Sequence, residues 1–202
     1  MTTHAPSGLP PLPEPDAASY RRAQQRLRRA FDEVRAACAW VDAPFGQLFL
    51  ARTARGLCRL TFRCDEDAAL AELERRRLLP EMAPARLDRE RRRLAAYFAG
   101  REHRLDLAVD LRGATAFQRD VLEAACRIPF GSVQSYGDVA RRIGRPAAVR
   151  AVGNALGKNP VAIVIPCHRV VAAGGRLGGY TGGLDVKRTL MALEGITLAT
   201  DR

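Results

Sequence analysis

The sequence predicts a mixed α+β or α/β fold in two parts. Short apolar runs separated by turn-forming Gly and Pro residues lie between residues 38 and 62, which is typical of an antiparallel meander. Helical periodicity and helix-capping residues replace that pattern from residue 115 onward. The chain of 202 residues is long enough for one sizeable domain or two small ones.

The formal net charge of +11 is carried almost wholly by arginine, because Lys158 and Lys187 are the only lysines. Such an excess favours polyanionic partners, nucleic acid first and an anionic membrane surface second. No apolar run approaches the roughly 18 residues that a membrane-spanning helix needs, and the N-terminus has no apolar secretory core. We therefore expect a cytoplasmic protein.

The five cysteines and three histidines show no C-x-x-C pair and no metal-type spacing. We expect no metal and no other cofactor. The alternative is a metal site whose ligands come from distant segments that the fold brings together. An odd number of cysteines without an export signal favours free thiols.

The first 37 residues are expected to lie outside the two main domains. Residues 1–18 are rich in Pro and small side chains, which predicts a disordered tail. Ser19 then precedes a segment with apolar residues at helical spacing, so residues 19–37 predict a basic helix. Its arginines either contact DNA phosphates or form a solvated face.

Residues 38–110 predict the N-terminal domain, in which no motif looks catalytic. The expected elements are strands at residues 39–41, 47–51 and 57–62, helices at 65–77 and 87–98, and a short strand at 105–107.

Residues 114–202 predict a C-terminal domain that begins with a helix over 117–128. Ser135 and Asp138 fit a capping box at the start of the next helix, which runs to residue 143. After Gly144-Arg145-Pro146, another helix reaches about residue 156. Two short helices joined by a tight turn predict a helix-turn-helix.

The second helix of this motif is unusual for a protein that reads the major groove. Its residues are small, including Ala151 and Gly153, and Arg150 is its one long cation. Small residues allow close approach to a narrow minor groove, whereas major-groove reading needs long polar side chains. A helix buried through its small residues is the alternative, but the net charge favours DNA binding.

Cys167 and His168 follow the apolar run 161–165 and are the strongest candidates for chemistry. The thiolate is the reactive form of cysteine, so a base or cation has to favour it. Lowering the pKa by about 2 from its ordinary value near 8.5 would raise the thiolate fraction many-fold. A buried cysteine beside a histidine also arises by chance, so the pair alone does not decide.

The pair belongs to a set of five segments whose order and spacing are recognisable. They are Arg150-Ala151-Val152-Gly153, Asn159-Pro160, Pro166-Cys167-His168-Arg169-Val170, Gly178-Gly179-Tyr180-Thr181-Gly182-Gly183 and Glu194-Gly195. Together they resemble the O6-alkylguanine-DNA alkyltransferases, also called methylated-DNA-protein-cysteine S-methyltransferases, over about residues 38–197. The resemblance implies an N-terminal ribonuclease-H-like domain and a C-terminal helical domain.

The resemblance also implies DNA repair by direct reversal. Such proteins bind duplex DNA through the minor groove, flip the damaged base out and move its alkyl group irreversibly to the cysteine. The implied substrate is O6-alkylguanine, with O4-alkylthymine as a second candidate, and each molecule reacts once. We expect a monomer at the bacterial nucleoid, and the sequence leaves cooperative DNA binding open.

The resemblance assigns a role to each matching residue. Cys167 would be the nucleophile, His168 would take its proton through a water, and Glu194 would orient the imidazole. Asn159 would fix the turn before the cysteine, and Tyr136 would contact the base edge and the rotated phosphate. The implied DNA- and substrate-binding residues are Arg150, Tyr136, Ala151, Gly153, Val170, Tyr180, Thr181 and Lys187. Core packing of the two tyrosines and a solvated Glu194 are the alternatives.

Two other classes of function compete with this hypothesis. A DNA-binding module that senses lesions without repairing them would lack the cysteine, so Cys167 argues against it. A Cys-His hydrolase would need an oxyanion hole and repeated turnover. A combined transcriptional regulator is disfavoured, because neither a second helix-turn-helix nor a four-cysteine zinc module precedes the domain.

Overall fold

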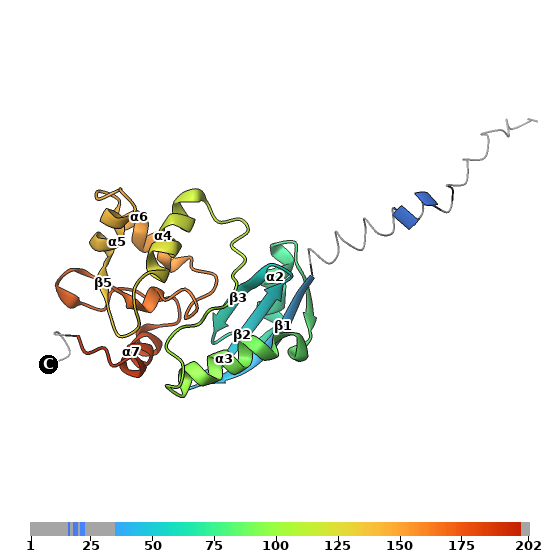
Figure 1. The fold of residues 1–202 in the computed structure, drawn as a ribbon, viewed down its shortest axis with the longest axis horizontal. Coiled ribbons are helices and arrows are strands. Elements are labelled where there is room, and N and C mark those ends of the chain that lie inside the picture. Colours follow the sequence, from blue (N-terminus) through green and yellow to red (C-terminus); the bar gives the residue numbers. More distant parts are fainter. Residues whose placement is uncertain (1–15, 17, 20, 23–34, 199–202) are drawn as a thin grey trace, which may run out of the picture. The chain divides into compact units, whose positions relative to one another are not determined.

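The computed structural model describes residues 16, 18, 19, 21, 22 and 35–198 (Figure 1). The chain divides into two units, residues 1–33 and 34–202. In the first unit, Ala18, Ser19, Arg21 and Arg22 are helical. The Asp16 carboxylate accepts hydrogen bonds from the amides of Ala18 and Ser19, so Asp16 and not Ser19 caps this turn. The expected tail and most of the expected basic helix lie outside the described residues.

A four-stranded sheet with the order β3-β2-β1-β4 forms the first part of the second unit. Its strands are β1 (Arg35–Ala43), β2 (Gly46–Thr53), β3 (Gly56–Phe62) and β4 (Leu79–Met82). The antiparallel meander of β1, β2 and β3 confirms the sequence prediction. Residues 35–37 are strand and not helix, because Arg35–Cys38 pair in parallel with Leu79–Met82.

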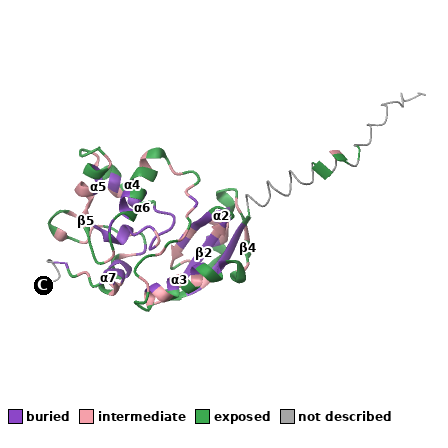
Figure 2. Ribbon diagram, viewed as in Figure 1, coloured by how far each residue is buried: buried purple, intermediate pink, exposed green. Residues whose placement is uncertain are grey.

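The two faces of the sheet are covered by different partners, as the alternation along the strands dictates. Cys38, Phe49 and Ala51 pack against Ala69 and Leu73 of α2 (Glu66–Arg75). The opposite face packs against α3 (Asp88–Phe98) and is continuous with the core of the helical part described below. Figure 2 shows the buried strands and the exposed outer sides of the helices. We call residues 35–110 the sheet part.

The helical part, residues 114–198, contains four α-helices among its described residues. They are α4 (Ala116–Cys126), α5 (Tyr136–Arg142), α6 (Val149–Gly157) and α7 (Leu184–Leu193). The capping box that opens α5 is confirmed: the Ser135 hydroxyl accepts from the Asp138 amide, and the Asp138 carboxylate accepts from the Ser135 amide. α5 and α6 form the expected helix-turn-helix.

The apolar run 161–165 is buried, but it forms a tight turn and not a straight element. Ile163 has φ +72°, and the amide of Ile165 bonds the Val161 carbonyl. The Leu60 amide of β3 bonds the Pro160 carbonyl at 2.8 Å and holds the turn against the sheet. A short 3-10 turn, Cys167–Arg169, follows directly, so the turn sets the position of the cysteine.

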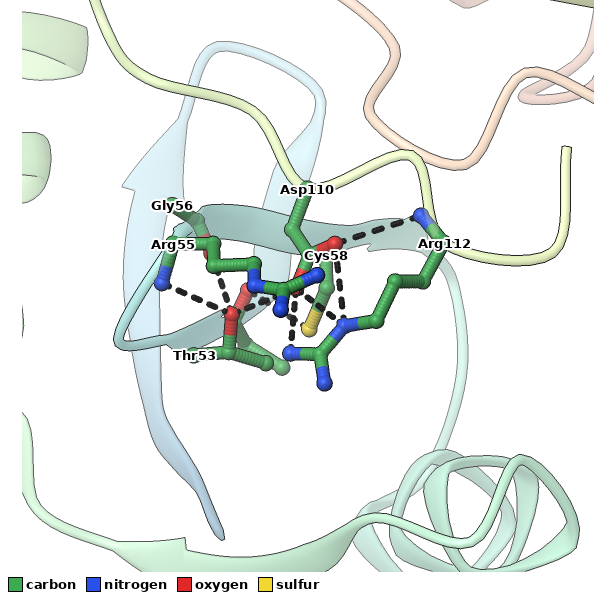
Figure 3. A network of polar contacts seen from close by, with 7 residues as sticks. Thr53, Arg55, Gly56, Cys58, Asp110 and Arg112 are labelled. Atoms are coloured by element: carbon green, nitrogen blue, oxygen red, sulfur yellow. Dashed lines mark hydrogen bonds and ion pairs between the residues drawn. The ribbon is translucent and has the colours of Figure 1, made fainter. Parts of the chain in front are cut away.

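The segment between the two parts is tied to the β2–β3 hairpin. Residues 105–107 do not form the expected strand; instead, Val109 makes an isolated bridge with Leu57. The Asp110 carboxylate accepts from the Thr53 hydroxyl at 2.6 Å and pairs with Arg112 at 2.6 Å (Figure 3). Burial opposes ionisation of Asp110, but the hydrogen bonds from Arg112 and Thr53 lower its pKa.

No helix in the described ranges is long and apolar enough to cross a membrane.

We predict that Gly56→Ala destabilises the fold through this tie. Gly56 has φ +143°, and a Cβ there would lie 2.8 Å from the Val109 nitrogen and closer still to the Ala108 carbonyl. Strain and overpacking together should lower the free energy of unfolding by about 2–4 kcal/mol in urea titrations. Gly46→Ala is the control, because Gly46 has φ +110° with nothing within 4 Å of its added Cβ. Equal losses for both variants would show that the contact with Ala108 contributes nothing.

Candidate functional site

Cys167 opens the 3-10 turn and is 6 % exposed. Its sulfur accepts a hydrogen bond from Asn159 Nδ2 at 3.1 Å. The same amide donates to the Ile165 carbonyl at 2.9 Å, and its oxygen accepts from the Val161 amide at 3.0 Å. Asn159 thus spans the tight turn and reaches the thiol, so one side chain fixes both the loop and the reactive atom.

The Glu194 carboxylate lies at the end of α7 and accepts five hydrogen bonds from four residues in three segments of the chain. Its Oε1 accepts from Tyr97 Oη at 2.6 Å, His168 Nε2 at 2.8 Å and an Arg169 NH2 group at 2.9 Å. Its Oε2 accepts from Arg169 Nε at 2.9 Å and the Gly131 amide at 3.3 Å. Glu194 is 4 % exposed and His168 is fully buried. This cluster therefore has no solvent to stabilise its charges.

The charge of Glu194 is balanced by Arg169. Burial alone would raise the pKa of Glu194, but the hydrogen bonds from His168 and Arg169 lower it to about 2. Burial lowers the pKa of His168, against the hydrogen bond and charge of Glu194. The carboxylate is therefore ionised and the imidazole neutral near pH 7.

The same geometry decides which nitrogen of His168 carries the proton. An ionised carboxylate only accepts hydrogen bonds, so Nε2 has to be the N–H that donates to Glu194. Nδ1 then keeps a lone pair. It is buried and has no hydrogen-bond partner among the described residues. His168 is thus set up as a base through Nδ1.

The pKa of the Cys167 thiol is set mainly by burial. Burial raises the pKa of Cys167 to about 11, although the hydrogen bond from Asn159 and the charge of Lys187 act to lower it. The sequence pattern showed the nearby base but gave no measure of desolvation. The free site therefore holds a neutral thiol.

Lys187 of α7 is fully buried behind the cysteine. Its ammonium donates to the Val170 carbonyl at 2.6 Å and to the Leu177 carbonyl. Burial lowers its pKa to about 8, while the Cys167 thiolate acts to raise it. Lys187, which the resemblance placed among the DNA- and substrate-binding residues, is therefore a buried cation near the sulfur.

A cavity of about 420 Å³ opens in front of Cys167. Its lining comes from α5, α6 and the loop before α7: Tyr136, Gly153, Leu156, Gly157, Cys167, Gly179, Tyr180 and Thr181. The volume falls in the range of small-molecule sites. The Tyr180 hydroxyl is buried beside the thiol, and its pKa is raised first by burial and then by the charge of the Cys167 thiolate and by its hydrogen bond with Cys167.

The residues of α6 differ in how far they are buried. Gly153 faces the cavity, where a Cβ would lie 3.9 Å from the Tyr136 ring, and Val152 is buried in the core. Arg150 and Ala151 are exposed. The helix is neither wholly buried nor wholly exposed, and its exposed Gly157 lines the cavity.

The structure brings most of the expected residues to one place. Tyr136, Gly153, Tyr180 and Thr181 line the cavity together with Cys167, and Asn159 donates to the Cys167 sulfur. Val170 contributes its backbone carbonyl, which accepts a hydrogen bond from Lys187. Arg150 and Ala151 lie on the exposed side of α6.

Two residues of the cluster were not predicted to have a role. Arg169 was visible beside the Cys-His pair, and its guanidinium also donates to the Ile128 carbonyl at 2.7 Å. Tyr97 comes from α3 in the sheet part, 97 residues from Glu194, and no local sequence signal marks it. In the described residues, no group of three or more His, Cys, Asp or Glu side chains is placed to hold a metal ion.

Comparison with known proteins gives both parts of the chain a family. Residues 116–196 match the "6-O-methylguanine DNA methyltransferase, DNA binding domain", and residues 37–111 match its "ribonuclease-like domain". The chain is 39 % identical over 157 residues to a methylated-DNA–protein-cysteine methyltransferase of Methanosarcina barkeri, which covers 76 % of the chain and 94 % of that relative. The ribonuclease-like match confirms the expected N-terminal domain type.

Bacterial relatives give the same result. A methylated-DNA–protein-cysteine methyltransferase of Mycolicibacterium paratuberculosis is 57 % identical over 101 residues, which span 50 % of the chain and 61 % of that relative. A crystal structure of Mycobacterium tuberculosis OGT in complex with DNA matches with a TM-score of 0.64 and 41 % identity, covering 80 % of the chain and 92 % of that structure. The chain belongs to the 6-O-methylguanine DNA methyltransferase family.

Proposed function

We propose that this protein repairs alkylated DNA by moving the alkyl group from O6 of guanine to the sulfur of Cys167, once per molecule. One observation carries the proposal: the thiol lines a cavity of about 420 Å³, and the next residue is a neutral imidazole that Glu194 holds with Nδ1 free. The mechanism needs a nucleophile, a base and a residue that orients the base, and this cluster supplies all three. O4-alkylthymine is a second candidate substrate.

The chemical step is an in-line displacement at the alkyl carbon. The thiol proton passes through a water to Nδ1 of His168, and the buried Glu194 stabilises the imidazolium that results. The bond from Sγ to the alkyl carbon forms as the bond from that carbon to O6 breaks. The Thr181 amide donates to the departing oxygen, and the guanine that remains takes up one proton.

The raised pKa of the resting thiol fits a protein that reacts only once. A buried neutral thiol is a poor nucleophile toward molecules that do not enter the cavity. Asn159 and the Lys187 ammonium both favour the thiolate over the thiol. The proton transfer to His168 then makes the thiolate available when the extruded base is in place.

We infer that duplex DNA binds along the exposed side of α6. Minor-groove contact suits its small residues, and Arg150 is placed to fill the gap that the flipped base leaves in the stack. The related Mycobacterium tuberculosis structure is described as a complex with DNA. Tyr136 would contact the base edge and the rotated phosphate, and the Cys167 and Val170 carbonyls would accept from the exocyclic amine of guanine.

The remaining proposals concern the setting of the protein. We infer that the protein is a monomer. Because duplex DNA is the proposed substrate, we also infer that the protein lies in the bacterial cytoplasm, at the nucleoid. The helical part, from residue 114 onward, would bind DNA and carry the reaction. The sheet part would support it through Tyr97.

Alkyl transfer is tested by intact-mass spectrometry after incubation with a duplex that contains O6-methylguanine. One equivalent should add a single methylene, about 14 Da, at the Cys167 peptide. Cys167→Ala should abolish the addition. Cys126→Ala is the control, because Cys126 is an exposed free thiol that should be dispensable. Methylation that persists in Cys167→Ala, or repeated turnover, would overturn the proposal.

The role of Glu194 predicts a pH-dependent effect on stability. Because its pKa falls from an ordinary 4.5 to about 2 on folding, its stabilising contribution is complete above about pH 4.5 and is lost as the pH falls towards 2. Glu194→Gln leaves the Arg169 charge buried without its counter-ion and should cost about 3–5 kcal/mol at pH 7. Urea unfolding of both proteins from pH 7 to pH 3 measures the difference, which should shrink on acidification. A difference that stays constant would mean that the charge of Glu194 is not involved.

A further inference from the structure

A second cavity, of about 780 Å³, adjoins the cavity that holds Cys167. Gly157 and Thr181 line both cavities, and the hydrogen bond from the Thr181 hydroxyl to the Gly157 carbonyl, at 3.0 Å, forms part of the wall between them. The second cavity lies between the C-terminal ends of α2 and α6 and the segment around Asp110. We call it the arginine hollow.

The charged residues that line the arginine hollow are mostly cations: Arg59, Arg76, Arg77, Arg112 and Lys158, with Asp110 as the one carboxylate. Asp110 is already engaged by Thr53 and Arg112 (Figure 3). Glu72 lies nearby and pairs with Arg59 at 2.6 Å and with Arg76 at 3.0 Å. The hollow therefore keeps a net positive charge.

Two of these cations have charges that no partner balances. Within residues 35–198, the side chains of Arg77 and Lys158 make no hydrogen bond or ion pair, and both residues are exposed. They come from different parts of the chain, Arg77 from the end of α2 and Lys158 from the end of α6. An anion between them would be bound from the sheet part and the helical part together.

The backbone at Arg77 does not call for an arginine. Its φ is +58°, in the left-handed region that favours glycine after a helix. The Arg77 amide bonds the Glu74 carbonyl at 2.8 Å, an interaction that a glycine would keep. The fold thus gains nothing from this side chain, and Arg77→Gly should fold at least as well as the parent.

We propose that the arginine hollow binds a backbone phosphate of the same duplex whose damaged base enters the Cys167 cavity. This inference rests on the proposed function. α6 is the helix proposed to lie along the duplex, and its C-terminal residues Gly157 and Lys158 lead directly from one cavity into the other. Lys and Arg side chains are the usual partners of DNA phosphates. The sheet part then contacts DNA and does more than support the site.

The test is duplex binding in a Cys167→Ala background, where no alkyl transfer occurs. The double variant Arg77→Gly/Lys158→Gln is compared with Arg89→Gln/Arg92→Gln, which removes the same charge from exposed positions on α3 outside the hollow. Each lost phosphate contact should lower the slope of log affinity against log salt by about one, so the hollow variant should lose about two. Its affinity at 0.1 M salt should fall on the order of tenfold, while the α3 variant stays within about twofold.

A second measurement locates the contact. Neutral methylphosphonate linkages are placed one at a time in both strands around the lesion. A neutral linkage at the position that occupies the hollow should weaken duplex binding by the parent. The same linkage should cause no further loss of affinity in the hollow variant. Urea unfolding of the hollow variant checks that it folds like the parent.

The outcomes separate the two proposals. Equal losses in the hollow and α3 variants would assign the effect to net charge and overturn the inference, as would a methylphosphonate scan without coupling. Retained duplex binding by the hollow variant together with lost self-association or binding of another macromolecule would overturn it too. Failure of the parent, with Cys167 intact, to take up the methyl group would instead reject the proposed function.

Discussion

The ionised carboxylate of Glu194, buried with five donors around it, is the interaction on which the rest of the site depends. A buried charge is tolerated only when it is paired and fully hydrogen-bonded, and Arg169 supplies both the counter-charge and two of the donors. Burial is the main cause of the lowered pKa of His168, and the charge of Arg169 adds to it against the carboxylate of Glu194. The base therefore stays neutral beside an ionised carboxylate.

The same carboxylate joins segments that are far apart in the sequence. Tyr97 reaches it from α3 in the sheet part, Gly131 from the turn between α4 and α5, and His168 and Arg169 from the turn that presents the thiol. The turn itself is held from the other side by Asn159 and by the bond from Leu60 of β3 to Pro160. The sheet part thus holds the reactive turn from two sides, although all of the matching motif segments lie in the helical part.

Local sequence patterns predicted most of the helices and strands and the residues that could react. Tertiary contacts determined the burial, hydrogen bonds and pKa values of those residues. The capping box of α5, the meander and the nearness of His168 to Cys167 follow from neighbouring residues, and the family resemblance added Glu194 and Asn159. β4 was missed because Leu79-Pro80-Glu81-Met82 has no apolar alternation and forms an exposed edge. Tyr97 was missed because only the fold brings it to Glu194. Burial raises the pKa of the Cys167 thiol, and a Cys-His pair in the sequence does not reveal burial.

The tautomer of His168 is the most direct test of this account, because every step from Glu194 to the thiol passes through it. The protein labelled with ¹⁵N-histidine would be studied by NMR at pH 7, with His168→Gln used to assign the signals among the three histidines. We predict a neutral ring with the proton on Nε2 and the chemical shift of an unprotonated nitrogen at Nδ1. A proton on Nδ1, or an imidazolium at pH 7, would contradict it.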